Sequence, residues 1–309
     1  MIHASPGASG TRIAEYCLHE ELPSRRTEIA YRATHRVLPR SARVAILKPE
    51  HVGTRDAEVQ LMREACVLET LHHAGVPRIY ECGVLDRRPW AASEQITGIA
   101  IEDLAARRPL PTGDAIAVVR DAAAVLAHAH GRGVIHRDLT PRSILRTAER
   151  SFPVCITEWG HAAIYGTALP RSDDPSARFY RAPEDADGGR AGAAGDVFAL
   201  GAVMFEAATL ALPEPSARFP GMPPAFHQLL ARMLARSPED RPTAEAVHAD
   251  ASRLAELYVD GDSAIEEVEV ELVDISRTQP SRHNLGWMPP ERVPRASQTM
   301  ATPRRRRRT

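Results

Sequence analysis

The hydrophobic pattern of this chain changes once, from short strand-like segments to longer helix-like ones, and this order constrains the fold most. Residues 13–96 contain short apolar, β-branched runs such as 42–47, interrupted by one stretch of helical spacing at 56–71. Apolar residues then recur every three or four positions through residues 112–130. Strands followed by helices predict an α+β fold in two parts.

The helical part contains one segment that is apolar on nearly all sides. Residues 196–210 form an almost continuous apolar run of helical length, which predicts a helix buried all round. Residues 226–234 and 243–257 supply two further amphipathic helices.

The composition is that of an ordinary soluble protein. The 309 residues, 43% hydrophobic with a formal net charge of −1, suit one two-lobed domain or two small ones plus a tail. No apolar run approaches the roughly 18–20 residues that cross a bilayer, and the N-terminus lacks a signal-peptide layout, so we expect a cytoplasmic location. The four cysteines form no C-x-x-C pair, which favours buried, reduced thiols over a metal or redox site.

Both ends of the chain differ in composition from the middle. Residues 1–11 are rich in Gly, Ser and Ala and are predicted to be unfolded. Residues 267–272 alternate acidic and apolar side chains, which indicates either an acidic disordered linker or a strand that adds to a partner's sheet edge. The chain closes with five arginines at 304–308, in a flexible basic tail that either stays solvated or contacts an acidic protein, a membrane surface or nucleic acid.

Four separated motifs occur in the helical part. They are His136-Arg137-Asp138-Leu139, Ala182-Pro183-Glu184, Gly195-Asp196-Val197-Phe198-Ala199-Leu200-Gly201 and Ser237-Pro238-Glu239-Asp240-Arg241-Pro242-Thr243. In this order they resemble the catalytic loop, the A-P-E motif, the start of the buried helix and the D-P-x-x-R-P-T stretch of bacterial Ser/Thr protein kinases. The resemblance extends over residues 12–258.

The resemblance implies a two-lobed protein-kinase-like fold. A small β-rich N-lobe with one main helix would occupy residues 12–97, and a larger helical C-lobe would occupy 98–258. Residues 1–11 would be a disordered N-terminus, and 259–309 an acidic linker with a disordered basic tail. The family's architecture further implies a buried ion pair between Arg241 and Glu184. It assigns structural positions to His136, Arg137, Trp159 and Asp196.

The catalytic loop retains one chemical residue of the family and has lost two. By the resemblance, Asp138 stands at the position of the base that accepts the substrate hydroxyl proton. Thr140 replaces the Lys that would neutralise charge on the transferred phosphoryl group. Ser143 replaces the Asn that holds a magnesium ion.

The magnesium-binding D-F-G motif is represented by Glu158-Trp159-Gly160. Glu can bind magnesium, but its extra methylene shifts the carboxylate by about an ångström in a site where such misplacement costs around a hundredfold in rate. Trp159 is expected to fill the apolar Phe pocket beside Leu68 and His136.

The phosphate-binding parts of the N-lobe depart further from the family. In the V-A-I-K strand, Ala45 would pack on the adenine, but Leu47 stands in place of the Lys. Lys48 comes one residue late, so alternation aims it at the opposite face unless a bulge turns it back. Its partner would be Glu64; otherwise Glu64 would face solvent or pair with another cation. The resemblance also places Glu94 and Leu145 at nucleotide-binding positions.

The glycine-rich loop has lost its three glycines. Pro23, Arg25 and Glu28 occupy their places, where glycine would let backbone amides approach phosphate. Pro23 lacks an amide donor, and Glu28 would bring negative charge toward a phosphate.

These substitutions predict a catalytically impaired pseudokinase that acts as a binding or regulatory module for protein partners in a signalling pathway. Such a module would bind ATP weakly or not at all. The alternative is an active Ser/Thr kinase with Asp138 as base, Ser143 and Glu158 as magnesium ligands, and Lys48 with Glu64 orienting the phosphates. Magnesium is expected only in that case. A transferase of another phosphoryl-like group is a third interpretation.

Overall fold

The computed structural model describes residues 11–164, 174–186, 192–212 and 222–258. The chain divides into two units, residues 1–271 and 272–309, and all described residues belong to the first. The predictions for residues 1–10, for the alternating segment at 267–272 and for the basic end lie outside the described residues.

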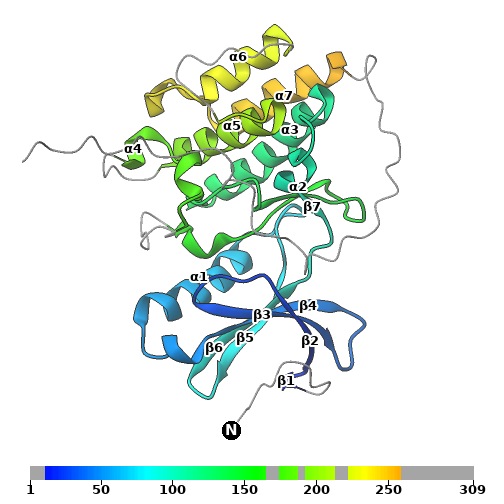
Figure 1. The fold of residues 1–309 in the computed structure, drawn as a ribbon, viewed down its shortest axis with the longest axis vertical. Helices are drawn as coiled ribbons and strands as arrows, with labels where there is room; N and C mark the ends of the chain where they lie inside the picture. Colours follow the sequence, from blue (N-terminus) through cyan, green and yellow to red (C-terminus); the bar gives the residue numbers. More distant parts are fainter. Residues whose placement is uncertain (1–10, 165–173, 187–191, 213–221, 259–309) are drawn as a thin grey trace, which may run out of the picture. The chain divides into compact units, whose positions relative to one another are not determined.

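The N-terminal part is an antiparallel sheet with one long helix, α1 (Arg55–Thr70). The strands are β1 (Arg12–Ile13), β2 (Tyr16–Leu22), β3 (Glu28–His35), β4 (Ser41–Leu47), β5 (Ile79–Leu85) and β6 (Arg88–Glu94). They are ordered β1-β2-β3-β4-β6-β5, so β4 lies inside the sheet between β3 and β6. Figure 1 shows α1 beside this sheet. We call the sheet and α1 the N-lobe.

Alternation along β4 gives its two faces different neighbours. Val44 and Ile46 belong to one buried cluster with Tyr16 and Trp90. Ala45 and Leu47 face the other way, into the cluster formed with Ala57, Leu61 and Ala65 of α1. The face that carries Ala45 is therefore the one that packs on the helix.

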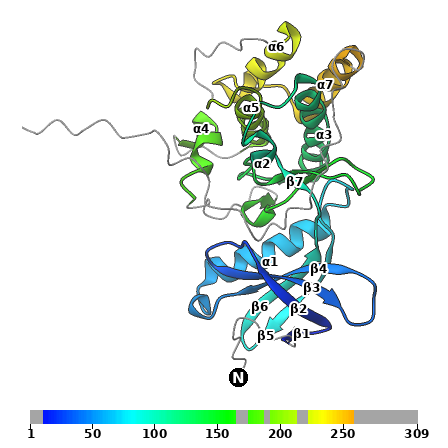
Figure 2. The ribbon, with the colours of Figure 1, turned by 45° about the vertical axis from the view of Figure 1, so that its right-hand side comes forward.

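The C-terminal part, which we call the C-lobe, is mainly helical. Its helices are α2 (Ile101–Ala105), α3 (Thr112–His130), α4 (Pro183–Ala186), α5 (Ala193–Thr209), α6 (Pro224–Met233) and α7 (Ala244–Tyr258). Short strands β7 (Ile99–Ala100), β9 (Ile144–Arg146) and β10 (Val154–Ile156) form one small sheet, and β8 (Val134–Ile135) pairs with β11 (Ala163–Ile164). Single 3₁₀ turns are η1 (Pro49–His51), η2 (Trp159–His161), η3 (Ala177–Tyr180) and η4 (Pro238–Asp240). Figure 2 shows α3, α5 and α7 gathered together.

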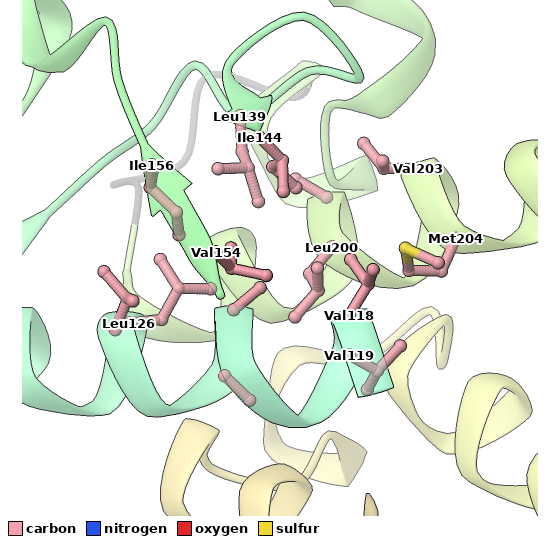
Figure 3. Close-up of a cluster of buried hydrophobic side chains, with 14 of the residues drawn as sticks. Val118, Val119, Leu126, Leu139, Ile144, Val154, Ile156, Leu200, Val203 and Met204 are labelled. Carbon is pink, nitrogen blue, oxygen red and sulfur yellow. The ribbon is translucent and has the colours of Figure 1, made fainter. Parts of the chain in front are cut away.

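The core of the C-lobe forms around α5. Ten of the α5 residues, including Leu200, Val203 and Met204, are buried, as its apolar run predicted. Figure 3 shows these residues facing Val118 of α3 and Ile144 of β9. The loop between β8 and β9 therefore rests directly on the largest hydrophobic cluster.

The α+β, two-lobed fold expected from the sequence is confirmed. The helices predicted at 56–71, 112–130, 196–210, 226–234 and 243–257 are α1, α3, α5, α6 and α7, each displaced by at most a few residues. Periodicity identified them because each buries a long apolar face.

The ion pair implied for Arg241 is present. Its guanidinium donates to both oxygens of Glu184, at 2.6 and 2.7 Å, and also to the carbonyls of Ala194, Ala235 and Arg236. The Arg241 side chain is fully buried, so this one group ties α4 to α5 and to the loop before α7.

Replacing Arg241 with Ala should lower the free energy of unfolding by about 3–5 kcal/mol, because a largely buried carboxylate and several carbonyls lose their donor. Urea denaturation monitored by circular dichroism measures this change. Arg253→Ala is the matched control, since that side chain is 70% exposed beside Asp250 and its loss should stay within about 0.5 kcal/mol. Equal effects of the two variants would contradict the structural role of Arg241.

Candidate active site

The candidate catalytic loop is held in place by the buried carboxylate of Asp196. Its oxygens accept hydrogen bonds from the backbone N–H groups of His136 and Arg137, each at 2.8 Å, and Oδ2 lies 2.8 Å from Nε2 of His130. Burial alone would raise the pKa of Asp196, but the hydrogen bond and charge of His130, the charge of His136 and the Arg137 N–H outweigh burial and lower this pKa. The charged carboxylate therefore orders the loop.

The base position itself is well formed. Arg137 has a left-handed backbone, with φ of 70°, and its side chain donates to the carbonyl of His161 at 3.3 Å. This turn places Asp138 next, half-buried, with its N–H directed at Nδ1 of His136 at 3.3 Å. Asp138 lines a cavity of about 10 Å³ together with Tyr180.

Ser143 is used by the loop itself. Its hydroxyl donates to the carbonyl of Thr140 and accepts from the N–H of Thr140, both at 3.0 Å, and Ser143 is completely buried. A hydroxyl in this position closes the loop, because the short side chain folds back onto the backbone. The role of Ser143 as a metal ligand stays a prediction. Thr140 is itself largely buried.

The Glu-Trp-Gly segment lies against α1 and the catalytic loop. Glu158 is half-buried with a left-handed backbone, φ of 65°. Trp159 is completely buried, its indole N–H donates to the carbonyl of Ile156 at 2.9 Å, and its ring lies 4.6 Å from that of His136. It shares one hydrophobic cluster with Leu68, so it occupies the apolar position expected for it.

The cation beside Glu64 comes from the loop between β2 and β3. Arg25 Nη1 donates to Oε2 of Glu64 at 2.5 Å. Leu47 is completely buried against α1, and Lys48 forms no ion pair with Glu64 in the part of the chain that the structure describes. Of the possibilities that the sequence left open for Glu64, the structure shows the pairing with another cation, Arg25.

Glu28 extends this pairing along the underside of the sheet. Its Oε1 accepts from Nη2 of Arg43 at 2.6 Å, and its Oε2 lies 3.8 Å from Nη1 of Arg25. The four residues alternate in charge, and we call Arg43–Glu28–Arg25–Glu64 the ion-pair chain. Glu28 is only 2% exposed, so its charge depends on the two guanidinium groups.

Burial and charge act on this chain in opposite directions. Burial alone would lower the pKa of Arg25, but the charges of Glu64 and Glu28, the hydrogen bond to Glu64 and the charge of Glu158 raise it. Burial would likewise raise the pKa of Glu64, whereas Arg25 and the more distant Arg43 and His136 lower it. Both partners are thus held in their charged forms.

The ion-pair chain runs beneath Ala30 and Ala45. Ala30 pairs with Ala45 across β3 and β4, and the flanking pairs on the same face are Glu28 with Leu47 and Arg32 with Arg43. Because Arg43 and Glu28 stand on either side of this alanine pair and meet, their side chains cross the face below it. Ala30 and Ala45 are 0% and 1% exposed.

The sequence also predicted nucleotide-binding roles for Leu145 and Glu94, and the structure places both residues in strands. Leu145 is half-buried in β9, opposite Cys155 of β10. Glu94 ends β6, where its carboxylate accepts from the N–H of Arg78 at 3.1 Å and from the guanidinium of Arg150. The Glu94 side chain therefore joins the N-lobe residue Arg78 to the C-lobe residue Arg150.

Comparison with known proteins places this geometry in a family. The model of the protein kinase domain family matches residues 30–251, well over half of the chain. The chain belongs to the protein kinase family. Two relatives are Ser/Thr-protein kinase PknJ of Mycobacterium tuberculosis, 28% identical over 281 residues, and Ser/Thr-protein kinase PrkC of Bacillus subtilis, 27% identical over 243 residues. These alignments cover 82% and 71% of this chain but 48% and 37% of the relatives, so the chain spans about half the length of the curated relatives it matches, or less.

Solved structures agree with the kinase fold. The crystal structure of the M. tuberculosis PknI kinase domain matches with a TM-score of 0.63 at 23% identity, over 80% of this chain and 98% of that one. The chain is thus a bacterial Ser/Thr protein kinase-like domain in its fold.

Within this kinase domain, sequence reasoning found the loop residues but missed the cations. The family motifs assign no role to Arg25 or Arg43. Two features of the sequence could have indicated a replacement cation: the arginine at a glycine position and the loss of the strand lysine. No group of three or more His, Cys, Asp or Glu side chains suited to a metal ion occurs among the described residues. Among those same residues, no helix is both long and apolar enough to cross a membrane.

The lowered pKa of Asp196 predicts how stability responds to acid. The unfolded chain takes up the proton first, near pH 4, so the stabilisation from this carboxylate is present above that pH and is lost as pH falls through the lowered folded-state pKa. Asp196→Asn cannot titrate, and the difference in free energy of unfolding between wild type and variant should shrink steadily below about pH 4. Urea denaturation at a series of pH values measures it, and a difference independent of pH would contradict the assignment.

Proposed function

We propose that this domain is a pseudokinase, a kinase-fold module that acts through protein partners in a signalling pathway and does not transfer phosphate. The observation that carries the proposal is the ion-pair chain, which fills the underside of the sheet with the protein's own charged side chains. The relatives are named as Ser/Thr kinases, which supports a role in signalling.

The first argument is steric. Ala30 and Ala45 are inaccessible to water, so an adenine would reach them only after displacing the side chains that cover them. Displacing Arg43 from Glu28 would leave a buried carboxylate short of a partner, at a cost of about 3–5 kcal/mol. Such a cost would raise the Kd of a micromolar ligand by roughly two to four orders of magnitude.

The second argument is electrostatic. Three carboxylates, of Glu28, Glu64 and Glu158, act on Arg25, and Arg43 is the only other cation of the ion-pair chain. A triphosphate brought to this region would meet a cluster with more negative than positive charge. Arg25 shares its charge among three carboxylates, whereas the family's lysine pairs with one glutamate, so Arg25 has less positive charge to offer a phosphate than that lysine has.

The third argument concerns magnesium. Ser143 is buried and bonded to the backbone of Thr140, which leaves the half-buried Glu158 as the remaining candidate ligand of the predicted pair. One carboxylate without its partner is a poor site for an ion that demands near-octahedral oxygen coordination. The residues present therefore do not fit magnesium-bound ATP.

A titration with magnesium-bound ATP tests the nucleotide part of the proposal. The melting temperature of the wild type should not change, because the native state lacks a site to which the nucleotide could bind. A ligand at a hundredfold excess over its Kd would add about 2.7 kcal/mol to stability, which a thermal-shift assay detects. Magnesium chloride alone is the control, and a rise specific to the nucleotide would contradict the proposal.

A double variant identifies what blocks the site. Arg25→Gly with Glu28→Gly restores two glycine positions and removes the middle of the ion-pair chain. We expect this variant to gain a thermal shift with ATP that the wild type lacks. If it does not, the block lies in Leu47 and the catalytic-loop substitutions instead.

The alternative function, an active Ser/Thr kinase, is favoured by one observation. Asp138 sits in a loop that is ordered by Asp196 and packed against Trp159 through His136, as a working base would require. Because Lys48 is not paired with Glu64, this function would need Arg25 to serve the phosphates.

Phosphate transfer distinguishes the two functions directly. Purified protein incubated with radioactive ATP, magnesium or manganese, and a Ser/Thr-containing peptide should label the peptide no more than Asp138→Asn does, because the loss of several cooperating groups leaves little catalysis. Labelling that exceeds the Asp138→Asn background would establish the active kinase.

A further inference from the structure

Arg25 joins three elements that are far apart in the sequence. It lies in the loop between β2 and β3, its Nη1 donates to Glu64 of α1 at 2.5 Å, and its guanidinium rests on Gly160 in η2. The side chain is 17% exposed and that of Glu64 is 14% exposed, so the pair is largely removed from water.

The seat on Gly160 exists because this residue has no side chain. A Cβ on Gly160 would lie 2.6 Å from Nη1, 2.8 Å from Cζ and 3.1 Å from Nη2 of Arg25, and these are the three nearest atoms it would meet. The Gly160 backbone is not in the left-handed region, so alanine is conformationally allowed there. A side chain at position 160 would therefore force the Arg25 guanidinium to shift, while the backbone conformation of Gly160 does not demand glycine.

The geometry points to Arg25 as the positioning residue that holds α1 against the Glu-Trp-Gly segment, with Gly160 as its seat. Direct contacts also join α1 to residues 159–162, among them Gln60 Nε2, which lies 2.7 Å from His161 Nε2, and Arg63, which donates to the carbonyl of Ala162 at 3.4 Å. Both are polar contacts at partly buried sites. Arg25 bridges the two elements in another way: its charge-assisted pair with Glu64 anchors it to α1, and its packing on Gly160 joins it to η2.

The consequence is that α1 is held without any ligand. This step deepens the proposed function and rests on it, since a bound nucleotide would otherwise contribute to the position of α1. Leu68 of α1 and Trp159 also share one buried cluster, which needs no ligand atom. The domain then offers a partner the same α1 surface whether or not ATP is present.

Hydrogen exchange of α1, measured by mass spectrometry on the full chain, tests the inference. Arg25→Ala and Gly160→Ala should each speed exchange across Arg55–Thr70 at least tenfold, because each removes the guanidinium from its seat. The double variant should exchange no faster than either single variant, since both act through the same contact. Lys48→Ala is the matched control and should leave α1 unchanged, as should the addition of ATP and magnesium to the wild type.

Peptides of α7 (Ala244–Tyr258) serve as the internal reference for an intact fold. Exchange in α1 that stays within twofold of wild type in Arg25→Ala would overturn the inference, and so would a full additional effect of Gly160→Ala in the Arg25→Ala background. If Gly160→Ala fails to fold, Arg25→Lys replaces it, with an expected acceleration below that of Arg25→Ala. Slower α1 exchange with ATP would refute ligand independence, whereas a thermal shift or peptide labelling would refute the proposed function.

Discussion

A carboxylate buried beneath the N-lobe sheet has to meet a cation, and the organisation of the site follows from this requirement. Glu28 is 2% exposed and Glu64 lies largely buried on α1, so each would be strongly destabilising without a partner. The strand position that could supply a lysine holds Leu47, which packs on α1 instead. Arg25 and Arg43 meet the requirement from the loop and from β4, and the region beneath Ala45 is filled in consequence.

The parts of the domain that preserve the fold do not depend on this region. Asp196 orders the catalytic loop, Arg241 binds Glu184, and Trp159 joins the hydrophobic cluster, each through contacts within the chain. These interactions stabilise the C-lobe whether or not a nucleotide binds. Substitution of the residues that bind phosphate and metal in the family is therefore compatible with an intact kinase fold, because catalysis and architecture use different residues.

Ser143 and Arg25 show why some roles could not be inferred from residue type alone. A serine at an asparagine position left open whether its hydroxyl would face a metal, and the short side chain instead bonds the backbone of Thr140 within the loop. An arginine at a glycine position indicated only that phosphate binding was impaired. Its partners, Glu64 and Gly160, lie far along the chain and are brought to it by the packing of α1 and η2.

The sequence by itself determined the family, the order of strands and helices, the buried α5 helix and the ion pair of Arg241 with Glu184. Each of these rests on periodicity or on a motif whose residues act in a fixed spacing. Only the tertiary structure decided which cation meets Glu64, where Ser143 directs its hydroxyl, and what covers Ala30 and Ala45. Those outcomes depend on the reach of long side chains between elements, and local sequence patterns carry no information about which of several charged groups is close enough to pair.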